Sequence, residues 1–199
     1  MKPFKTPPTR YNLAARWLHW LMAVLLLATL FIGAAMGSAL QWRPQLLNTH
    51  LVLGVSIFIV VLLRIGNRLL STRPLPPAGL SPGHRFGLAL VHLCFYALMT
   101  TLPLMGWAML SAGGYPTPSV LGIRLPALVQ PEPKLYTTLH DSHAVLAYGF
   151  FALILLHLAA ALFHAWVKRD SIFTRMGFGS TRKSKDDLHL NNISHTSQR

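Results

Sequence analysis

Four stretches of apolar residues, separated by polar or turn-forming segments, divide the chain. They run over Trp17–Leu40, Leu46–Leu63, Phe86–Leu110 and His140–Val167. A helix needs about 20 residues to cross a hydrocarbon core of about 30 Å, so each stretch predicts a spanning helix, the second being the shortest. We therefore expect an all-α integral membrane protein, a four-helix bundle whose two termini lie on the same side of the membrane.

Composition agrees with a membrane protein. Charged residues make up 12% of the chain and apolar residues 52%, whereas soluble domains carry about 25% charged residues. The small-residue run Gly33–Ala39 also resembles the cleavage site of a signal peptide. The apolar stretch before it is longer than the 7–15 residues of a signal-peptide core, which favours a retained helix. The single cysteine, Cys94, cannot form an intrachain disulfide.

The basic residues are distributed unequally between the two ends of the predicted bundle. Fifteen of the 18 Lys and Arg residues lie before the first stretch, around the second loop or after the fourth stretch. The other three are Arg43, Arg124 and Lys134. Cytoplasmic loops carry the excess of Lys and Arg, so both termini are expected in the cytoplasm. Orientation and anionic lipid explain the net charge of +13 without a nucleic-acid partner.

Three regions are expected along the chain. Residues 1–16 form a cytoplasmic basic arm, 17–168 the four-helix transmembrane domain, and 169–199 a polar basic cytoplasmic tail whose composition predicts disorder. The second loop, STRPLPPAGLSPGHR, is a proline- and glycine-rich connector. The third loop, about Ser111–Leu139, is the longest and is expected to form an extracytoplasmic cap.

Histidines inside the apolar stretches are the candidate functional residues. His143 and His157 are fourteen residues apart in the fourth stretch, so on a helix they share a face about 21 Å apart along the axis. Alone, they could equally be polar residues that hydrogen-bond to neighbouring helices. However, His50 near the start of the second helix is expected at the same depth in the membrane as His143. His19 near the start of the first helix is expected at the depth of His157 or His164.

Spacing favours His157 over His164, and the residue types favour haem over zinc. A site at His164 would lie about 31 Å along the axis from one at His143, at the opposite edge of the hydrocarbon, where electron tunnelling between them would be slow. Zinc prefers about four ligands, often thiolates, and the spans offer a single cysteine. Two imidazoles on opposite sides of a buried plane suit a haem iron, and with both axial positions filled the natural role is one-electron transfer.

Several motifs resemble the bacterial cytochrome b561 family, which is related to the b-type cytochrome subunits of nickel–iron hydrogenases and formate dehydrogenases. They are RWLHW around His19, NTHLVLG around His50, VVLLRIGNRL, and the spacing of His143 and His157 followed by HLAAALFHAW. The resemblance covers about Arg10–Arg175. It implies two haem b groups, one held by His19 and His157 and the other by His50 and His143.

The resemblance also suggests residues near the cofactors. His92, in VHLCFY, matches a histidine common in the family and is expected to pack or to contact a quinone. His164 and Arg16 are candidates for contact with a haem propionate or a quinone. Alternatively, and equally well, His164 is a residue at the membrane rim whose polar end extends to the aqueous interface.

The function implied is a dihaem b-type cytochrome in the bacterial inner membrane that passes electrons to or from the quinone pool. Family members that act alone include a superoxide oxidase, which transfers an electron from superoxide to ubiquinone. The basic residues Arg43, Arg124 and Lys134 could attract such an anion, although they are also ordinary loop residues. The alternative is a membrane-anchor or electron-relay subunit that takes electrons from a hydrogenase-like or dehydrogenase-like redox protein. A histidine-lined metal or proton transporter is a third interpretation.

Overall fold

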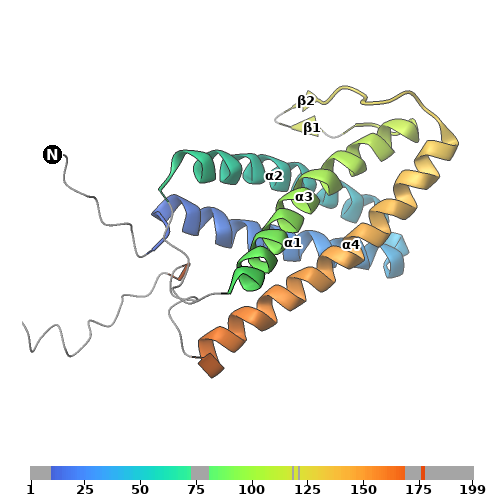
Figure 1. Cartoon of the computed structure of the whole chain (residues 1–199). Helices are drawn as coiled ribbons and strands as arrows, with labels where there is room; N and C mark the ends of the chain where they lie inside the picture. Colours follow the sequence, from blue (N-terminus) through green and yellow to red (C-terminus); the bar gives the residue numbers. More distant parts are fainter. Residues whose placement is uncertain (1–9, 73–80, 118, 121, 169–175, 178–199) are drawn as a thin grey trace, which may run out of the picture.

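Four long helices dominate the computed structural model, which describes residues 10–72, 81–117, 119–120, 122–168 and 176–177. They are α1 Leu13–Ser38, α2 Arg43–Leu70, α3 Pro82–Ala112 and α4 Pro133–Leu162 (Figure 1). A 3-10 turn, η1 Leu40–Trp42, joins the first two. All four long helices are long and apolar enough to cross a membrane. They confirm the expected all-α membrane bundle, whereas the side on which the termini lie stays a prediction.

The helices begin at residues that satisfy or remove their first free N–H groups. In α1 the side chain of Asn12 accepts a hydrogen bond from the Ala15 N–H at 2.7 Å. In α3 the Ser81 hydroxyl accepts one from the His84 N–H at 3.4 Å. The Glu132 carboxylate accepts from two N–H groups at the start of α4. Helices α2, α3 and α4 each have a proline in their first two positions, where a missing N–H has no cost.

Helix α2 continues well beyond the end of its apolar stretch at Leu63. The two arginines that interrupt the apolar pattern find partners on neighbouring helices. The Arg64 guanidinium donates to the carbonyl of Leu18 on α1 at 3.2 Å, and Arg68 lies 5.5 Å from the ring centroid of Tyr96 on α3. Because Arg64 is half-buried against α1 and the exposed Arg68 contacts a ring of α3, the helix does not end where hydropathy falls.

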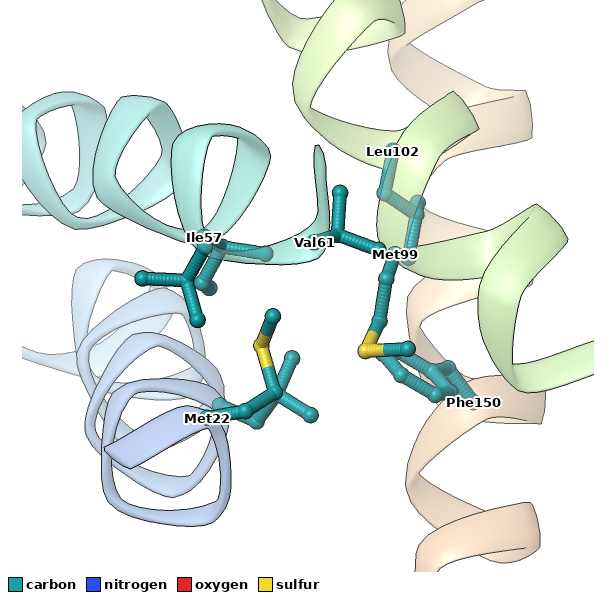
Figure 2. Packing of buried hydrophobic residues seen from close by; sticks show 8 residues of the cluster. Met22, Ile57, Val61, Met99, Leu102 and Phe150 are labelled. Carbon is teal, nitrogen blue, oxygen red and sulfur yellow. The ribbon is translucent and has the colours of Figure 1, made fainter. Parts of the chain in front are cut away.

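The helices pack in chain order, α1 along α2, α2 along α3 and α3 along α4. Helix α4 makes few close backbone contacts with α1 or α2. The buried core includes Met22 of α1, Ile57 and Val61 of α2, Met99 of α3 and Phe150 of α4 (Figure 2). Phe150 is seven residues from His143 and seven from His157. The apolar core therefore lies between the two levels at which the histidines occur.

The segment between α3 and α4 folds back onto the end of α3. Strands β1 Ser119–Val120 and β2 Ile123–Arg124 pair in antiparallel fashion. The Trp107 indole N–H donates to the carbonyl of Pro126 at 2.9 Å. The Ser111 hydroxyl accepts from a loop N–H at 3.1 Å. These bonds fix the loop at the end of the bundle opposite the termini, as expected for a cap.

Three expectations concern segments that lie largely outside the described residues, and they stay predictions. They are the basic arm before residue 10, the connector at 73–80, and the disordered tail at 169–175 and 178–199. One turn of the tail is described. Arg16 donates to the carbonyl of Gly177, and the Trp20 indole donates to the carbonyl of Met176 at 3.2 Å. This turn therefore lies against the start of α1.

Candidate cofactor site: two histidine pairs

His50 of α2 and His143 of α4 form the loop-side pair, named for its position toward the α3–α4 loop. Their ring centroids are 6.3 Å apart, with the planes at 65°. His50 Nδ1 lies 3.2 Å from the carbonyl oxygen of Thr29. Because a carbonyl only accepts, Nδ1 carries the proton and Nε2 keeps a free lone pair, the arrangement typical of a metal-binding histidine. The His143 Nδ1 atom is buried and has no hydrogen-bond partner within the described part of the chain.

Two glycines face the rings of this pair. A Cβ atom on Gly33 of α1 would lie 3.2 Å from His50 Cε1, which is closer than an ordinary van der Waals contact. A Cβ atom on Gly106 of α3 would lie 3.6 Å from His143 Cε1, at ordinary contact distance. The absence of a side chain at Gly33 therefore allows the His50 ring to lie close against α1.

His19 of α1 and His157 of α4 form the second pair, the termini-side pair. Their ring centroids are 6.5 Å apart, with the planes at 74°. Arg64 Nη1 lies 3.2 Å from His19 Nδ1 and donates to the Leu18 carbonyl at the same distance. The bond to Leu18 holds the guanidinium beside His19 whichever proton state the ring takes. His19 is half-buried and His157 is exposed, so this pair is more open than the loop-side pair.

The spacing within each pair suits one metal ion between the two rings. An imidazole nitrogen binds a metal at roughly 2 Å, and the ring centroid lies roughly 1.1 Å behind that nitrogen. Two imidazoles on opposite sides of one ion therefore have centroids roughly 6 to 6.5 Å apart. Both observed separations, 6.3 and 6.5 Å, agree with this value. Two axial histidines from facing helices are a typical donor set for a haem iron.

Aromatic rings occupy the space between the two pairs. Phe150 lies on the same face of α4 as His143 and His157 and is 2% exposed. The Phe95 ring of α3 contacts it edge to face, with the centroids 5.7 Å apart, and lies 5.2 Å from the His157 ring. The two pairs are therefore separated by packed aromatic side chains rather than by polar groups.

The other residues singled out in the sequence lie outside the two pairs. His92 Nδ1 lies 2.6 Å from the Leu88 carbonyl of its own helix, and the side chain is exposed. His164 lies in a π-helical turn, η2 Phe163–Lys168, that continues α4. It is the ring of His157, not His164, that faces His19. Contact of His92, His164 or Arg16 with a quinone or propionate stays a prediction.

Sequence reasoning did not identify Arg64, Thr29 or Gly33 as neighbours of the histidines. For Arg64 a signal existed, because a cation directly at the end of an apolar stretch is costly to bury and implies a partner. Thr29 and Gly33 gave no such signal, because small and hydroxyl residues are ordinary in spanning helices. Their roles depend on how α1 is rotated toward α2, which a single sequence does not state.

The loop end of the bundle carries the three isolated basic residues. Their side chains are all exposed; they are Arg43 at the start of α2, Arg124 in β2 and Lys134 at the start of α4. Within the described ranges, no group of three or more His, Cys, Asp or Glu side chains could hold a metal ion. The histidine pairs are therefore the arrangement that stands out for metal chemistry in this part of the chain.

Comparison with known proteins identifies relatives along most of the chain. The family described as prokaryotic cytochrome b561 matches residues 10–179. Cytochrome b561 homolog 2 of Escherichia coli (strain K12) is 25% identical over 177 residues, covering 87% of this chain and 94% of that protein. A Yersinia pestis protein named "Probable superoxide oxidase CybB" is 30% identical over 171 residues, covering 84% and 95%. Cytochrome b562 of Cereibacter sphaeroides is 26% identical over 166 residues, covering 80% and 89%.

Proposed function

The chain belongs to the prokaryotic cytochrome b561 family, and from this premise we propose that it holds two haem b groups and transfers electrons across the cytoplasmic membrane between the outer face and a quinone. Membership makes it a b-type cytochrome of a bacterial membrane that takes part in electron transfer. The number of haems, the ligands, the donor and the acceptor are the content of the proposal.

The observation that carries the proposal is the presence of two histidine pairs at two levels of α4, each with the spacing of axial ligands. His50 and His143 would hold one haem, and His19 and His157 the other. Each haem supplies a one-electron redox couple. The Thr29 carbonyl keeps His50 in the tautomer that leaves Nε2 free. Arg64 provides a positive charge beside His19.

The excess of basic residues at the end that carries the termini supports an orientation with that end in the cytoplasm. The basic arm 1–16 and the tail 169–199 would then flank a transmembrane domain at 17–168. In this orientation the loop-side pair is nearer the outer aqueous face. Electrons that enter there would pass inward to the termini-side pair.

Superoxide is the donor that we propose at the outer face. The name of the Yersinia pestis relative supports this choice, and so do the exposed side chains of Arg43, Arg124 and Lys134, because basic groups at an open face attract a small anion. A quinone dissolved in the bilayer is the proposed acceptor. His164, His92 and Arg16 are the candidate contacts for the quinone or for a haem propionate.

The test combines haem content with electron delivery in the intact protein. A pyridine haemochrome assay should give two haem b per chain, and the reduced-minus-oxidised spectrum should be that of six-coordinate, low-spin haem. Superoxide generated outside proteoliposomes should reduce the haem, and ubiquinone in the bilayer should reoxidise it. One haem per chain would contradict the dihaem assignment. Failure of superoxide to reduce the protein, with reduction by a co-purifying dehydrogenase, would establish the relay-subunit alternative.

A further inference from the structure

A small cavity, open on one side to the surface, lies between the end of α3 and the start of α4, outside both histidine pairs. Its volume is about 220 Å³, and a cavity of about 150 Å³ can already hold benzene. The walls include the aromatic rings of Tyr115 and Tyr136 and the rings of Pro131 and Pro133. The volume and these flat apolar walls suit one aromatic ring with a few small substituents.

The two tyrosines provide a specific aromatic wall. Their ring centroids are 5.8 Å apart, with the planes at 53°. Gly113 permits this arrangement, because a Cβ atom there would lie 2.5 Å from Tyr115 Cδ2 and 2.9 Å from Tyr136 Cδ2. Within the described part of the chain, neither phenol hydroxyl has a hydrogen-bond partner. Each is thus able to bond to a polar substituent on a bound ring.

The charge of the lining indicates a neutral occupant. Glu132 is the ionisable acid of the wall, and no basic side chain lines the cavity. Its carboxylate already accepts hydrogen bonds from two backbone N–H groups at the start of α4. An anion such as superoxide would meet like charge here without a compensating cation. The cavity therefore differs in chemistry from the exposed basic residues at the same end of the bundle.

The position of the cavity relates it to electron transfer. On α4, Tyr136 precedes His143 by seven residues, which is about 10.5 Å along the axis and within about 20° of two full turns. Gly113, which caps the end of α3, follows Gly106 by the same seven residues, and Gly106 faces the His143 ring. Each wall of the cavity thus lies about two helical turns from the loop-side pair, on the face of its helix that points toward that pair.

We propose that this cavity binds a small, neutral, water-soluble hydroquinone that serves as a second electron donor to the loop-side pair. This inference rests on the proposed function. A bound hydroquinone would give one electron to a haem held by His50 and His143, which would supply the one-electron acceptor, and would release one hydroxyl proton to water at the mouth of the cavity. Two of the resulting radicals disproportionate to one hydroquinone and one quinone, so electrons and protons balance.

Binding and reduction are tested separately on the haem-loaded protein. Phenol, which serves as a binding probe, should give a saturable signal in saturation-transfer NMR. Hydroquinone should reduce the haem in stopped flow with a rate that saturates. Replacing an aromatic wall should raise both half-saturation concentrations about fivefold or more. The variants are Tyr136→Leu on α4 and Tyr115→Leu in the loop, the second remaining informative if the first disturbs α4. Tyr148→Leu is the control, because Tyr148 lies on the same helix and is 74% exposed.

Reduction by superoxide, measured on the same protein, tests the proposed function independently of the cavity. If the phenol signal and the hydroquinone concentration dependence are the same in the wild type and both wall variants, the cavity is not a binding site, even though superoxide still reduces the protein. Non-saturating hydroquinone reduction would overturn the proposal in the same way. If superoxide fails to reduce the wild type while hydroquinone reduces it through the cavity, the superoxide assignment fails and the cavity assignment stands.

Discussion

Arg64→Gln should lower the midpoint potential of the haem at the termini-side pair and leave the other potential unchanged. In the wild type, Arg64 Nη1 lies 3.2 Å from His19 Nδ1. An iron bound at Nε2 would lie roughly 7 Å from the guanidinium, since the imidazole and one metal bond together add roughly 4 Å. A positive charge at that distance disfavours the ferric state, which carries one more positive charge than the ferrous state.

The size of the effect follows from Coulomb's law. At an effective dielectric constant of about 20, two unit charges roughly 7 Å apart interact by about 2.4 kcal/mol. For a one-electron couple this corresponds to about 100 mV. Arg64 is half-buried, and screening by nearby solvent reduces the expected fall to about 50–100 mV.

Potentiometric titration of the purified protein, followed at the haem absorption bands, would resolve the two potentials. Arg64→Lys is the matched control, because it keeps the charge while it loses the planar guanidinium. Its potential should stay close to that of the wild type. An unchanged or raised potential in Arg64→Gln, or a fall confined to the other haem, would refute the assignment of Arg64 to the termini-side haem.

Four further predictions follow from the same structure. His157→Ala should retain one haem per chain and His164→Ala both, as measured by pyridine haemochrome; the reverse result would move the ligand on α4. A reporter that is active only in the cytoplasm should be active when it is fused at the C-terminus or inserted at residues 73–80. An external C-terminus would reverse the direction proposed for electron flow. The three basic charges of the loop end are removed by Arg43→Gln, Arg124→Gln and Lys134→Gln. This change should slow the reduction of the protein by superoxide and weaken the dependence of that rate on salt. An unchanged rate would show that these residues do not attract superoxide. Phe150→Ala should destabilise the protein by about 3–5 kcal/mol in chemical unfolding, and a loss below about 1 kcal/mol would mean that the core closes around the gap.

The helices could be predicted from sequence because they depend on one-dimensional patterns. A run of apolar residues long enough to span lipid forms a helix, because a helix satisfies every backbone hydrogen bond within the segment. The depths of His19, His50 and His143 in the membrane then follow from counting residues along each helix. Helix ends were less predictable. α2 passes Arg64 because that side chain reaches α1, and α4 starts at Pro133 because Glu132 caps it, neither of which hydropathy reports.

The side-chain partners required the three-dimensional structure. Whether His50 meets Thr29 or another carbonyl depends on the rotation of α1 about its own axis, and a change of one residue turns a helix by about 100°. The wall formed by Tyr115 and Tyr136 joins a loop to a helix across about twenty residues of chain. No periodic pattern records that contact, and it depends on the bonds that tie the loop to α3.

Because α4 supplies one histidine to each pair and follows α1, α2 and α3 in the chain, the order of synthesis limits the order of assembly. A nascent chain that has inserted α1, α2 and α3 contains His19 and His50 but neither of their partners. The two pairs are thus completed by the same event, the insertion of α4. Under the proposed ligand assignment, haem loading with both axial ligands would consequently be late and coupled, and a chain that stops before residue 133 is expected to bind neither haem in this way.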